Sequence, residues 1–193
     1  MLGKVKVGIS NRHVHLTQEH VEVLFGAGHK LTPYRDLVQT GEFAAEETVV
    51  LVGPKGKLEK VRVLGPTRAS SQVEISLTDG FVLGVRPPVR QSGDIAASPG
   101  IRMEGPQGAL DLTEGVIAAM RHIHMSTADA QAMGLQDGDF VDVVANTERP
   151  AVFRKVLVRV RDSFILECHI DTDEANGAAL CNGDELVILG VSD

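Results

Sequence analysis

The sequence contains no tryptophan, one tyrosine and only two cysteines, Cys168 and Cys181. Two cysteines cannot form a disulfide framework, which indicates thiols that are kept reduced in the cytoplasm. No apolar run approaches the roughly 20 residues that cross a bilayer. The N-terminal MLGKVKVGIS lacks the long apolar core of a secretory signal. We therefore expect a cytoplasmic protein with no membrane partner.

Positive charge is in deficit, because 19 Lys and Arg residues stand against 26 Asp and Glu residues, for a formal net charge of −7. This balance argues against nonspecific nucleic-acid binding. It also means that an anionic substrate needs a local positive site on the protein. The length of 193 residues is that of one ordinary domain or two small ones.

Alternation of apolar and polar residues is the dominant pattern, and turn signals separate the alternating segments. The expected strands cover residues 4–10, 48–52, 58–64, 71–78, 138–145, 152–160, 163–171 and 185–190. Short strands at this spacing are typical of small β-barrels or sandwiches. The sequence therefore predicts a mainly β protein.

Few helices are expected, and all are short. Thr17 and Ser126 can each cap a helix, and these helices end at Gly26 and Gly134. The segment TEGVIAAMR, from Thr113 on, predicts a third helix.

One motif occurs twice, as NRHVHLT at residues 11–17 and as MRHIHMS at residues 120–126. The offset between the paired histidines is constant, since 122 − 13 = 109 and 124 − 15 = 109. Each copy reads as a short strand, a capping hydroxyl and a helix of about two turns. This agreement indicates an internal duplication with two related halves.

The histidines of each copy share one face of a strand, because residues i and i+2 of a strand project to the same side. His13 and His15 form one such pair, and His122 and His124 form the other. Two imidazoles on one face can converge on a metal ion. A single pair of this kind is more often an ordinary pair of partly buried histidines, but two copies in matched contexts favour the metal hypothesis.

Candidates for further ligands follow from the same alternation. A catalytic zinc usually takes three protein ligands and leaves one position open. His169 lies on the polar face of its strand, whereas Cys168 falls on the apolar face and is expected in the core. Glu74 also lies on the polar face of its strand. It is either an oxygen ligand or an ordinary surface carboxylate. His20 and His29 are expected at the surface without a role.

Five segments occur in order between Val5 and Leu189, and together they identify a family: SNRHVHLT, GPTRASSQVEIS, RPPVRQSGD, RHIHMS and HIDTDEANG. The chain resembles the PduL-type phosphotransacylases, also called phosphate propanoyltransferases. These enzymes interconvert acyl-CoA plus phosphate with acyl phosphate plus CoA. The resemblance implies two small β-barrels, related by the duplication, with short capping α-helices. It divides the chain into residues 1–11 with 120–193, and residues 12–119, with the first strand exchanged.

The resemblance also implies a site with two metal ions, normally Zn²⁺, although the ligand chemistry admits Co²⁺. By position, one ion would be held by His13, His15 and Glu74, and the other by His122, His124 and His169. The two sets of ligands then differ in net charge. The essential arginine of the family falls on Arg68, which we expect to be catalytic.

Coenzyme A contacts of the family fall on six positions of this chain: Ser10, Arg35, Arg62, Leu64, His169 and Asn176. A lysine is common in the family where this chain has Arg35, which keeps the charge but changes the donor geometry. The expected substrates are propanoyl-CoA or acetyl-CoA, inorganic phosphate and acyl phosphate. We also expect a homo-oligomer.

Relatives that work in bacterial microcompartments for propanediol degradation carry an amphipathic N-terminal extension. This chain begins about a dozen residues before its first histidine pair. We therefore expect either a cytosolic relative or a chain from which such an extension has been removed.

Because phosphate is itself the nucleophile, we expect direct attack on the thioester in a ternary complex, without an acyl-enzyme. Three other hypotheses remain open from the residues. The same ligands suit a dinuclear zinc thioester hydrolase, which would activate water instead. The metals would be purely structural if each had a fourth protein ligand. The chain would be a metal-free binding module if the histidine pairs were coincidental.

Overall fold

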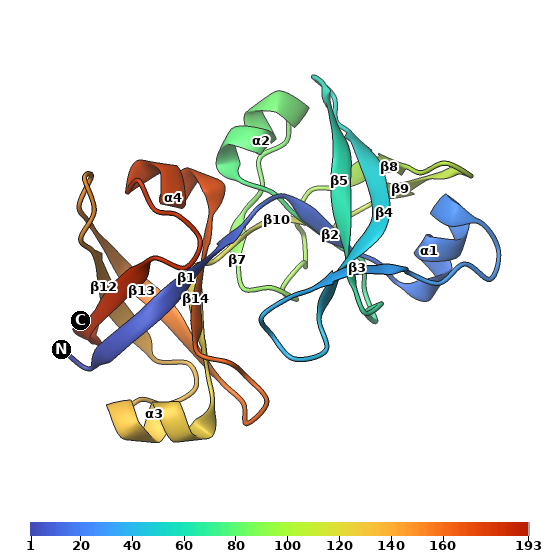
Figure 1. Cartoon of the computed structure of the whole chain (residues 1–193). Coiled ribbons are helices and arrows are strands. Elements are labelled where there is room, and N and C mark those ends of the chain that lie inside the picture. Colours follow the sequence, from blue (N-terminus) through green and yellow to red (C-terminus); the bar gives the residue numbers. More distant parts are fainter. Residues whose placement is uncertain (193) are drawn as a thin grey trace. The chain divides into compact units, whose positions relative to one another are not determined.

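The computed structural model describes residues 1–192 and confirms a mainly β protein with four short helices. The chain folds as two compact units. Unit 1 combines Met1–Ser10 with the chain from Met120 on, and unit 2 is Asn11–Ala119. Each unit has its own hydrophobic core, and Figure 1 follows the chain through both.

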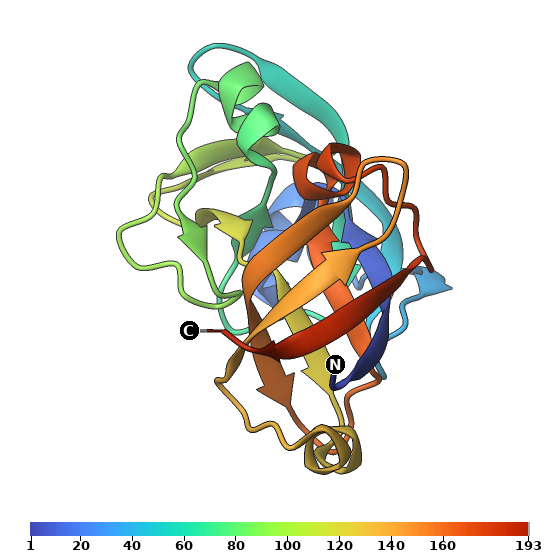
Figure 2. The ribbon, with the colours of Figure 1, turned by 90° about the vertical axis from the view of Figure 1, so that its left-hand side faces the viewer.

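Unit 1 is a closed six-stranded barrel in the order β1-β14-β11-β13-β12-β15. Its strands are β1 (Gly3–Ser10), β11 (His122–Met125), β12 (Phe140–Ala145), β13 (Ala151–Val160), β14 (Glu167–Asp171) and β15 (Glu185–Val191). The first strand closes the ring, because β1 pairs in parallel with β14 and antiparallel with β15. Figure 2 shows this blue strand among the orange and red strands of the C-terminal part.

Unit 2 is a nine-stranded sheet in the order β7-β10-β6-β2-β5-β4-β8-β9, with β3 paired to β4. Its strands are β2 (His13–His15), β3 (Pro33–Asp36), β4 (Phe43–Val52), β5 (Lys57–Gly65), β6 (Gln72–Glu74), β7 (Val89–Arg90), β8 (Ile101–Glu104), β9 (Ala109–Leu112) and β10 (Val116–Ala119). Where a closed barrel was expected, this unit is a half-barrel. A backbone hydrogen bond from Val116 N to Pro99 O, at 3.0 Å, joins the start of β10 to the chain just before β8.

The two units repeat the same arrangement around their histidine strands. In unit 2, β2 lies between a parallel neighbour, β5, and an antiparallel neighbour, β6. In unit 1, β11 lies in the same way between β13 and β14. Even an irregularity recurs, because Lys60 of β5 and Lys155 of β13 both have positive φ, at 56° and 54°. These matches are the structural expression of the duplication.

The strand that precedes each histidine strand pairs within the other unit. β1 runs directly before β2 in the chain, yet it belongs to the barrel of unit 1. β10 runs directly before β11, yet it pairs in parallel with β6 of unit 2. The chain therefore changes unit twice, each time two or three residues before a histidine pair.

Four helices follow the strands that carry the candidate ligands. They are α1 (Gln18–Phe25), α2 (Leu77–Leu83), α3 (Thr127–Met133) and α4 (Thr172–Gly177). The caps expected at Thr17 and Ser126 are confirmed, as are the helix ends at Gly26 and Gly134. Two helices, α2 and α4, were not predicted. No helix within residues 1–192 is long and apolar enough to cross a membrane.

The helix expected from Thr113 on is wrong, because this segment forms the strand β10. Gly115, with φ of 130°, adopts a conformation that no helix residue has. The following residues are buried and pair in parallel with β6 on one side and β7 on the other. Tertiary pairing thus overrides the helix propensity of the two alanines, Ala118 and Ala119.

Candidate functional site

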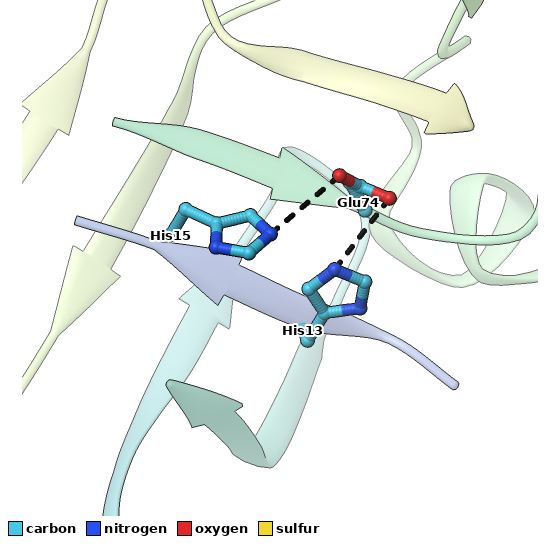
Figure 3. Close-up of side chains that lie close together, drawn as sticks. All are labelled: His13, His15 and Glu74. Carbon is cyan, nitrogen blue, oxygen red and sulfur yellow. Dashed lines mark ion pairs between the residues drawn. The ribbon is translucent and has the colours of Figure 1, made fainter. Parts of the chain in front are cut away.

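The first histidine pair lies in β2, where His13 and His15 are 8% and 3% exposed. The antiparallel register places His13 opposite Glu74, the last residue of β6. His13 Nε2 lies 3.5 Å from Glu74 Oε2, and His15 Nε2 lies 3.7 Å from Glu74 Oε1. Figure 3 shows both rings turned toward the same carboxylate. Two neighbouring strands therefore bring two nitrogens and one carboxylate together.

This set of donors fits a divalent cation. Within residues 1–192, the ligand atoms of these three side chains form the one group of this kind that falls within 4.8 Å. Zinc–ligand bonds of about 2.0–2.2 Å place tetrahedral ligand atoms roughly 3.3–3.6 Å apart, close to the spacing seen here. His13 Nδ1–H donates to Asn11 O at 2.8 Å, which leaves Nε2 as the nitrogen with a free lone pair. The buried Nδ1 of His15 has no hydrogen-bond partner among the residues that the structure describes.

Glu74 also accepts hydrogen bonds from two neutral donors. Ser92 Oγ donates to Glu74 Oε1 at 2.9 Å, and Gln72 Nε2 donates to the same oxygen at 2.5 Å. The amide oxygen of Gln72 in turn accepts from Gly93 N at 2.7 Å. Sequence reasoning missed Gln72 as a site residue, although alternation places it on the same strand face, two residues before Glu74.

The pKa values of this cluster follow from burial and from the charges of neighbouring groups. Burial acts to raise the pKa of Glu74, but the charges of His13 and His15 outweigh it and hold that pKa well below its usual range. Burial acts to lower the pKa of His13, yet the Glu74 carboxylate raises it above the ordinary value. Burial, then the charges of His13 and Arg68, lower the pKa of His15 to about 3. His15 is therefore a neutral imidazole at physiological pH.

Arg68 lies beside this cluster, on the segment between β5 and β6. Its backbone N–H donates to Leu16 O at 2.9 Å, which ties the segment to the end of β2. The guanidinium makes two long contacts, to Ser92 Oγ at 3.3 Å and to Glu42 Oε1 at 3.4 Å. It lines a pocket of about 240 Å³, with Ala69, Ser70, Gln72, Gly93 and Ile95. A cation on the wall of a small pocket suits the binding of an anion.

The second histidine pair lies in β11, and the register places His122 opposite His169 of β14. The ring centroids of His122, His124 and His169 lie 4.7–5.1 Å apart, close to the 5.0 Å between His13 and His15. As in the first copy, Nδ1–H of the leading histidine donates to a backbone oxygen two residues earlier, here Met120 O at 2.8 Å. The rings of His122 and His169 are stacked within 4° of parallel, so a shared ion would need one of them to turn.

His124 is the most enclosed ring of this second cluster. Its ring centroid lies 4.3 Å from that of Phe164, and its buried Nδ1 has no hydrogen-bond partner within the described part of the chain. Burial, and then the charges of His122 and His169, hold the pKa of His124 well below its ordinary value. Like His15, it is therefore a neutral imidazole that is available as a ligand.

An arginine directly before each pair clamps the strand to a helix of the same unit. Arg12 binds Asp79 of α2 through two contacts, Nε to Oδ2 at 3.0 Å and NH2 to Oδ1 at 2.7 Å. Arg121 binds Glu174 of α4, NH1 to Oε1 at 2.7 Å. Both carboxylates also complete the capping box of their helix. The duplication therefore includes these clamps, which sequence reasoning missed.

The candidate coenzyme A residues fall in both units. Arg35, exposed on β3, and Leu64, half-buried on β5, share the register partner Ala44 of β4. Arg62 of β5 pairs with His13 in register, and its NH1 donates to Ala45 O and Glu46 O, both at 2.9 Å. In unit 1, Ser10 pairs with Asp171, the cap of the helix that carries the exposed Asn176.

Three further expectations have clear outcomes. Cys168 is confirmed as a core residue, being fully buried. His20 and His29 are not at the surface as expected, because both are half-buried and hydrogen-bonded. Nδ1 of His20 lies 2.7 Å from Ser71 Oγ, and His29 Nε2–H donates to the buried Glu47 carboxylate at 2.7 Å.

Comparison with known proteins gives a consistent result. The sequence profile of phosphate propanoyltransferases matches residues 6–181. A phosphate propanoyltransferase of Thermotoga maritima is 56% identical over 184 residues, covering 95% of this chain and 88% of its own. One of Lachnoclostridium phytofermentans is 54% identical over 186 residues, covering 96% and 87%. One of Rhodopseudomonas palustris is 51% identical over 181 residues, covering 94% and 80%.

Proposed function

The chain belongs to the phosphate propanoyltransferase family, and from this premise we propose that it transfers a short acyl group between coenzyme A and inorganic phosphate. In this reaction a phosphate oxygen attacks the thioester carbonyl, the carbon–sulfur bond breaks, and CoA leaves as a thiolate that takes a proton from solvent. The products are acyl phosphate and CoA.

The observation that carries the proposal is the buried group of His13, His15 and Glu74 beside the pocket of Arg68. We assign these three side chains to one divalent metal ion, and His122, His124 and His169 to a second. Zn²⁺ suits both sets, with Co²⁺ as an alternative. When bound, such ions would supply positive charge that binds anionic phosphate and polarises the thioester carbonyl.

The side chains have separate tasks in this proposal. Arg68 binds phosphate and stabilises the negative charge of the tetrahedral intermediate, exchanging its long contacts to Ser92 and Glu42 for shorter ones to the substrate. Ser92 and Gln72 keep Glu74 ionised and in place. Local positive charge at this pocket allows a protein of net charge −7 to gather two anionic substrates.

Transfer is direct in this proposal, because phosphate is itself the nucleophile and the thiol of Cys168 is not available as one. Cys168 is fully buried, and burial strongly raises its pKa, so it is a protonated core thiol and not a nucleophile. Phosphate and acyl-CoA therefore bind together in a ternary complex.

We assign five side chains to the binding of coenzyme A: Ser10, Arg35, Arg62, Leu64 and Asn176. Acetyl-CoA is an additional substrate, the enzyme is a homo-oligomer, and it works in the cytoplasm, with a microcompartment lumen as the alternative.

The test is CoA release from propanoyl-CoA, measured with and without phosphate. We expect release to require phosphate, with sequential initial-rate kinetics. Arg68→Ala should lower the rate by roughly 10²–10³, the usual cost of losing one such donor. Arg102→Ala is the matched control, because Arg102 pairs with Glu104 and Asp111 on an exposed part of unit 2.

Two results would contradict the proposal. Release that is equally fast without phosphate would indicate a thioester hydrolase. Ping-pong kinetics would indicate a covalent acyl-enzyme in place of the ternary complex.

A further inference from the structure

Glu167 is a buried carboxylate to which the proposed function gives no task. It lies on β14, two residues before His169, and is only 8% exposed. Its Oε2 lies 2.9 Å from His169 Nε2. Within residues 1–192 this nitrogen has no hydrogen-bond partner, so the contact with Glu167 is a close approach of the two groups without hydrogen-bond geometry. A buried carboxylate is costly unless nearby positive charge compensates it.

The duplication shows which residue stands in its place in unit 2. The register of β14 against β11 sets Glu167 opposite His124. The register of β6 against β2 sets Gln72 opposite His15. Glu167 and Gln72 are therefore equivalent, and each precedes the third side chain of its histidine cluster by two residues.

The two units combine these positions in opposite ways. In unit 2 the neutral amide of Gln72 donates to the carboxylate of Glu74. In unit 1 the carboxylate of Glu167 stands beside the imidazole of His169. Each cluster thus holds its own histidine pair and one carboxylate, although the carboxylate occupies a different position in each. The difference in charge expected from the six candidate ligands alone disappears once Glu167 is counted.

The barrel leaves room for this carboxylate. Gly8 of β1 lies next to His169 in register, and a Cβ on Gly8 would come within 2.8 Å of the Glu167 Cδ and Oε1 atoms. In unit 2 the residue in register with Glu74 is Ile117, whose side chain is fully buried. Unit 1 therefore has a glycine at a place where a side chain would displace the Glu167 carboxylate.

We propose that Glu167 belongs to the His122/His124/His169 cluster and supplies, beside His169, the negative charge that holds a divalent cation there. This inference rests on the two metal sites of the proposed function. It adds a seventh residue to the six candidate ligands.

The test is Co²⁺ affinity of the full chain, stripped of metal and titrated in competition with a chromophoric chelator. His13→Ala removes the unit 2 site, so the double variant His13→Ala/Glu167→Gln reports on the unit 1 site alone. We expect Glu167→Gln to weaken Co²⁺ binding about 10–100-fold relative to His13→Ala, the usual effect of a residue that supports a ligand. Glu167→Asp, which keeps the charge, should retain more of the affinity.

Glu185→Gln is the matched control, because Glu185 is an exposed carboxylate of the same barrel, paired with Lys4. Equal Co²⁺ affinity with Glu or Gln at position 167 would overturn the inference while leaving the metal sites standing. If His13→Ala bound no Co²⁺ at all, the unit 1 site of the proposed function would fail as well. Should Glu167→Gln not fold, Gly8→Ala decides, because it displaces the carboxylate without removing it. If the double variant His13→Ala/Gly8→Ala bound Co²⁺ as tightly as His13→Ala, the inference would be overturned.

Discussion

Single residues of the two histidine clusters have features that suit the proposed metal ligands. Nδ1–H of the leading histidine of each pair donates a hydrogen bond to a backbone oxygen, at 2.8 Å in both copies. The lone pair of that histidine is therefore on Nε2. The second histidine of each pair is kept neutral by burial. Since only neutral imidazole binds metal, the neutrality of His15 and His124 would lower the cost of loading the proposed sites.

The same burial makes the metal-free protein sensitive to acid. His15 has a pKa of about 3 in the folded chain against 6.5 for an ordinary histidine, and the pKa of His124 is lowered too. Between these values the unfolded chain binds more protons, so stability falls as pH drops below 6.5. His13, with its raised pKa, and Glu74, with its lowered pKa, contribute little change in this window, because their effects lie above 6.5 and below about 4.5.

We therefore predict that chelator-treated protein loses about 2 kcal/mol of unfolding free energy between pH 6.5 and 5.5, about half from each buried histidine. Urea denaturation at the two pH values measures it. His15→Asn should remove about half of the loss, whereas the exposed substitution Arg102→Ala should leave it unchanged. A free energy that stayed level down to pH 5.5 would contradict the assignment of both rings as buried and neutral.

At the scale of elements, the arginine clamps fix where each histidine strand begins. Arg12 forms an ion pair with Asp79 through two guanidinium nitrogens, and Asp79 is only 3% exposed. In unit 1, Arg121 forms the corresponding ion pair with Glu174. Both arginines come directly after the point at which the chain changes unit. The clamp thus joins the histidine strand to the helix that follows the third candidate ligand.

Arg12→Ala and Arg121→Ala should each lower the free energy of unfolding by about 1.5–3 kcal/mol, because each leaves a buried or half-buried carboxylate without its charged donor. Arg→Lys at either position should recover only part of this, since lysine lacks the planar fork. Thermal or urea unfolding gives the values. Arg102→Ala, at an exposed ion pair, should change stability by less than about 1 kcal/mol. Equal losses for the clamps and for Arg102 would show that the clamps are ordinary surface pairs.

Local signals in the sequence were sufficient for elements that local chemistry decides. The helices after Thr17 and Ser126 have a capping hydroxyl, two turns of helix formers and a closing glycine, and both form as predicted. β10 has no local sequence signal that would identify it as a strand. It forms by pairing with β6 and β7, which are distant in sequence. The helices α2 and α4 were missed because each follows its strand almost without a break: α2 begins inside the alternating segment 71–78, and α4 begins directly after the alternating segment 163–171.

The candidate site divides in the same way. Alternation alone placed His13 with His15 and set Glu74 on a polar face. It could not show that β6 lies beside β2, so the pairing of Glu74 with His13 depends on long-range register. Ser92 and Glu42, which contact Arg68, come from loops whose position no periodicity specifies. Glu167 and Gln72 were within reach of alternation, but only the paired registers show that they are equivalent.

At the scale of the whole molecule, the two changes of unit make unit 1 depend on residues distant in sequence. The ring of unit 1 closes only when β1 pairs with β14 and β15, more than 150 residues away in the chain. Unit 2 in turn takes β10 from the segment just before β11. Unit 1 therefore cannot complete its barrel from one continuous stretch of chain, whereas the sheet of unit 2 is complete within Asn11–Ala119. Because β1 and β10 lead directly into the histidine strands β2 and β11, we expect loosening of a histidine strand to affect the strand that precedes it.

Metal should therefore stabilise the whole chain beyond the strands that it contacts. An ion that binds only the folded state adds RT ln(1 + [L]/Kd), about 2.7 kcal/mol per site at 100 times Kd. We predict that chelation lowers the unfolding temperature, and that titration with Zn²⁺ restores it with saturation at two equivalents. His13→Ala and His124→Ala should each saturate at one equivalent, with a smaller rise in unfolding temperature. Calorimetry with parallel metal quantitation measures both quantities. An unfolding temperature indifferent to chelation, in protein shown to lose its metal, would mean that the ions bind without coupling to the fold.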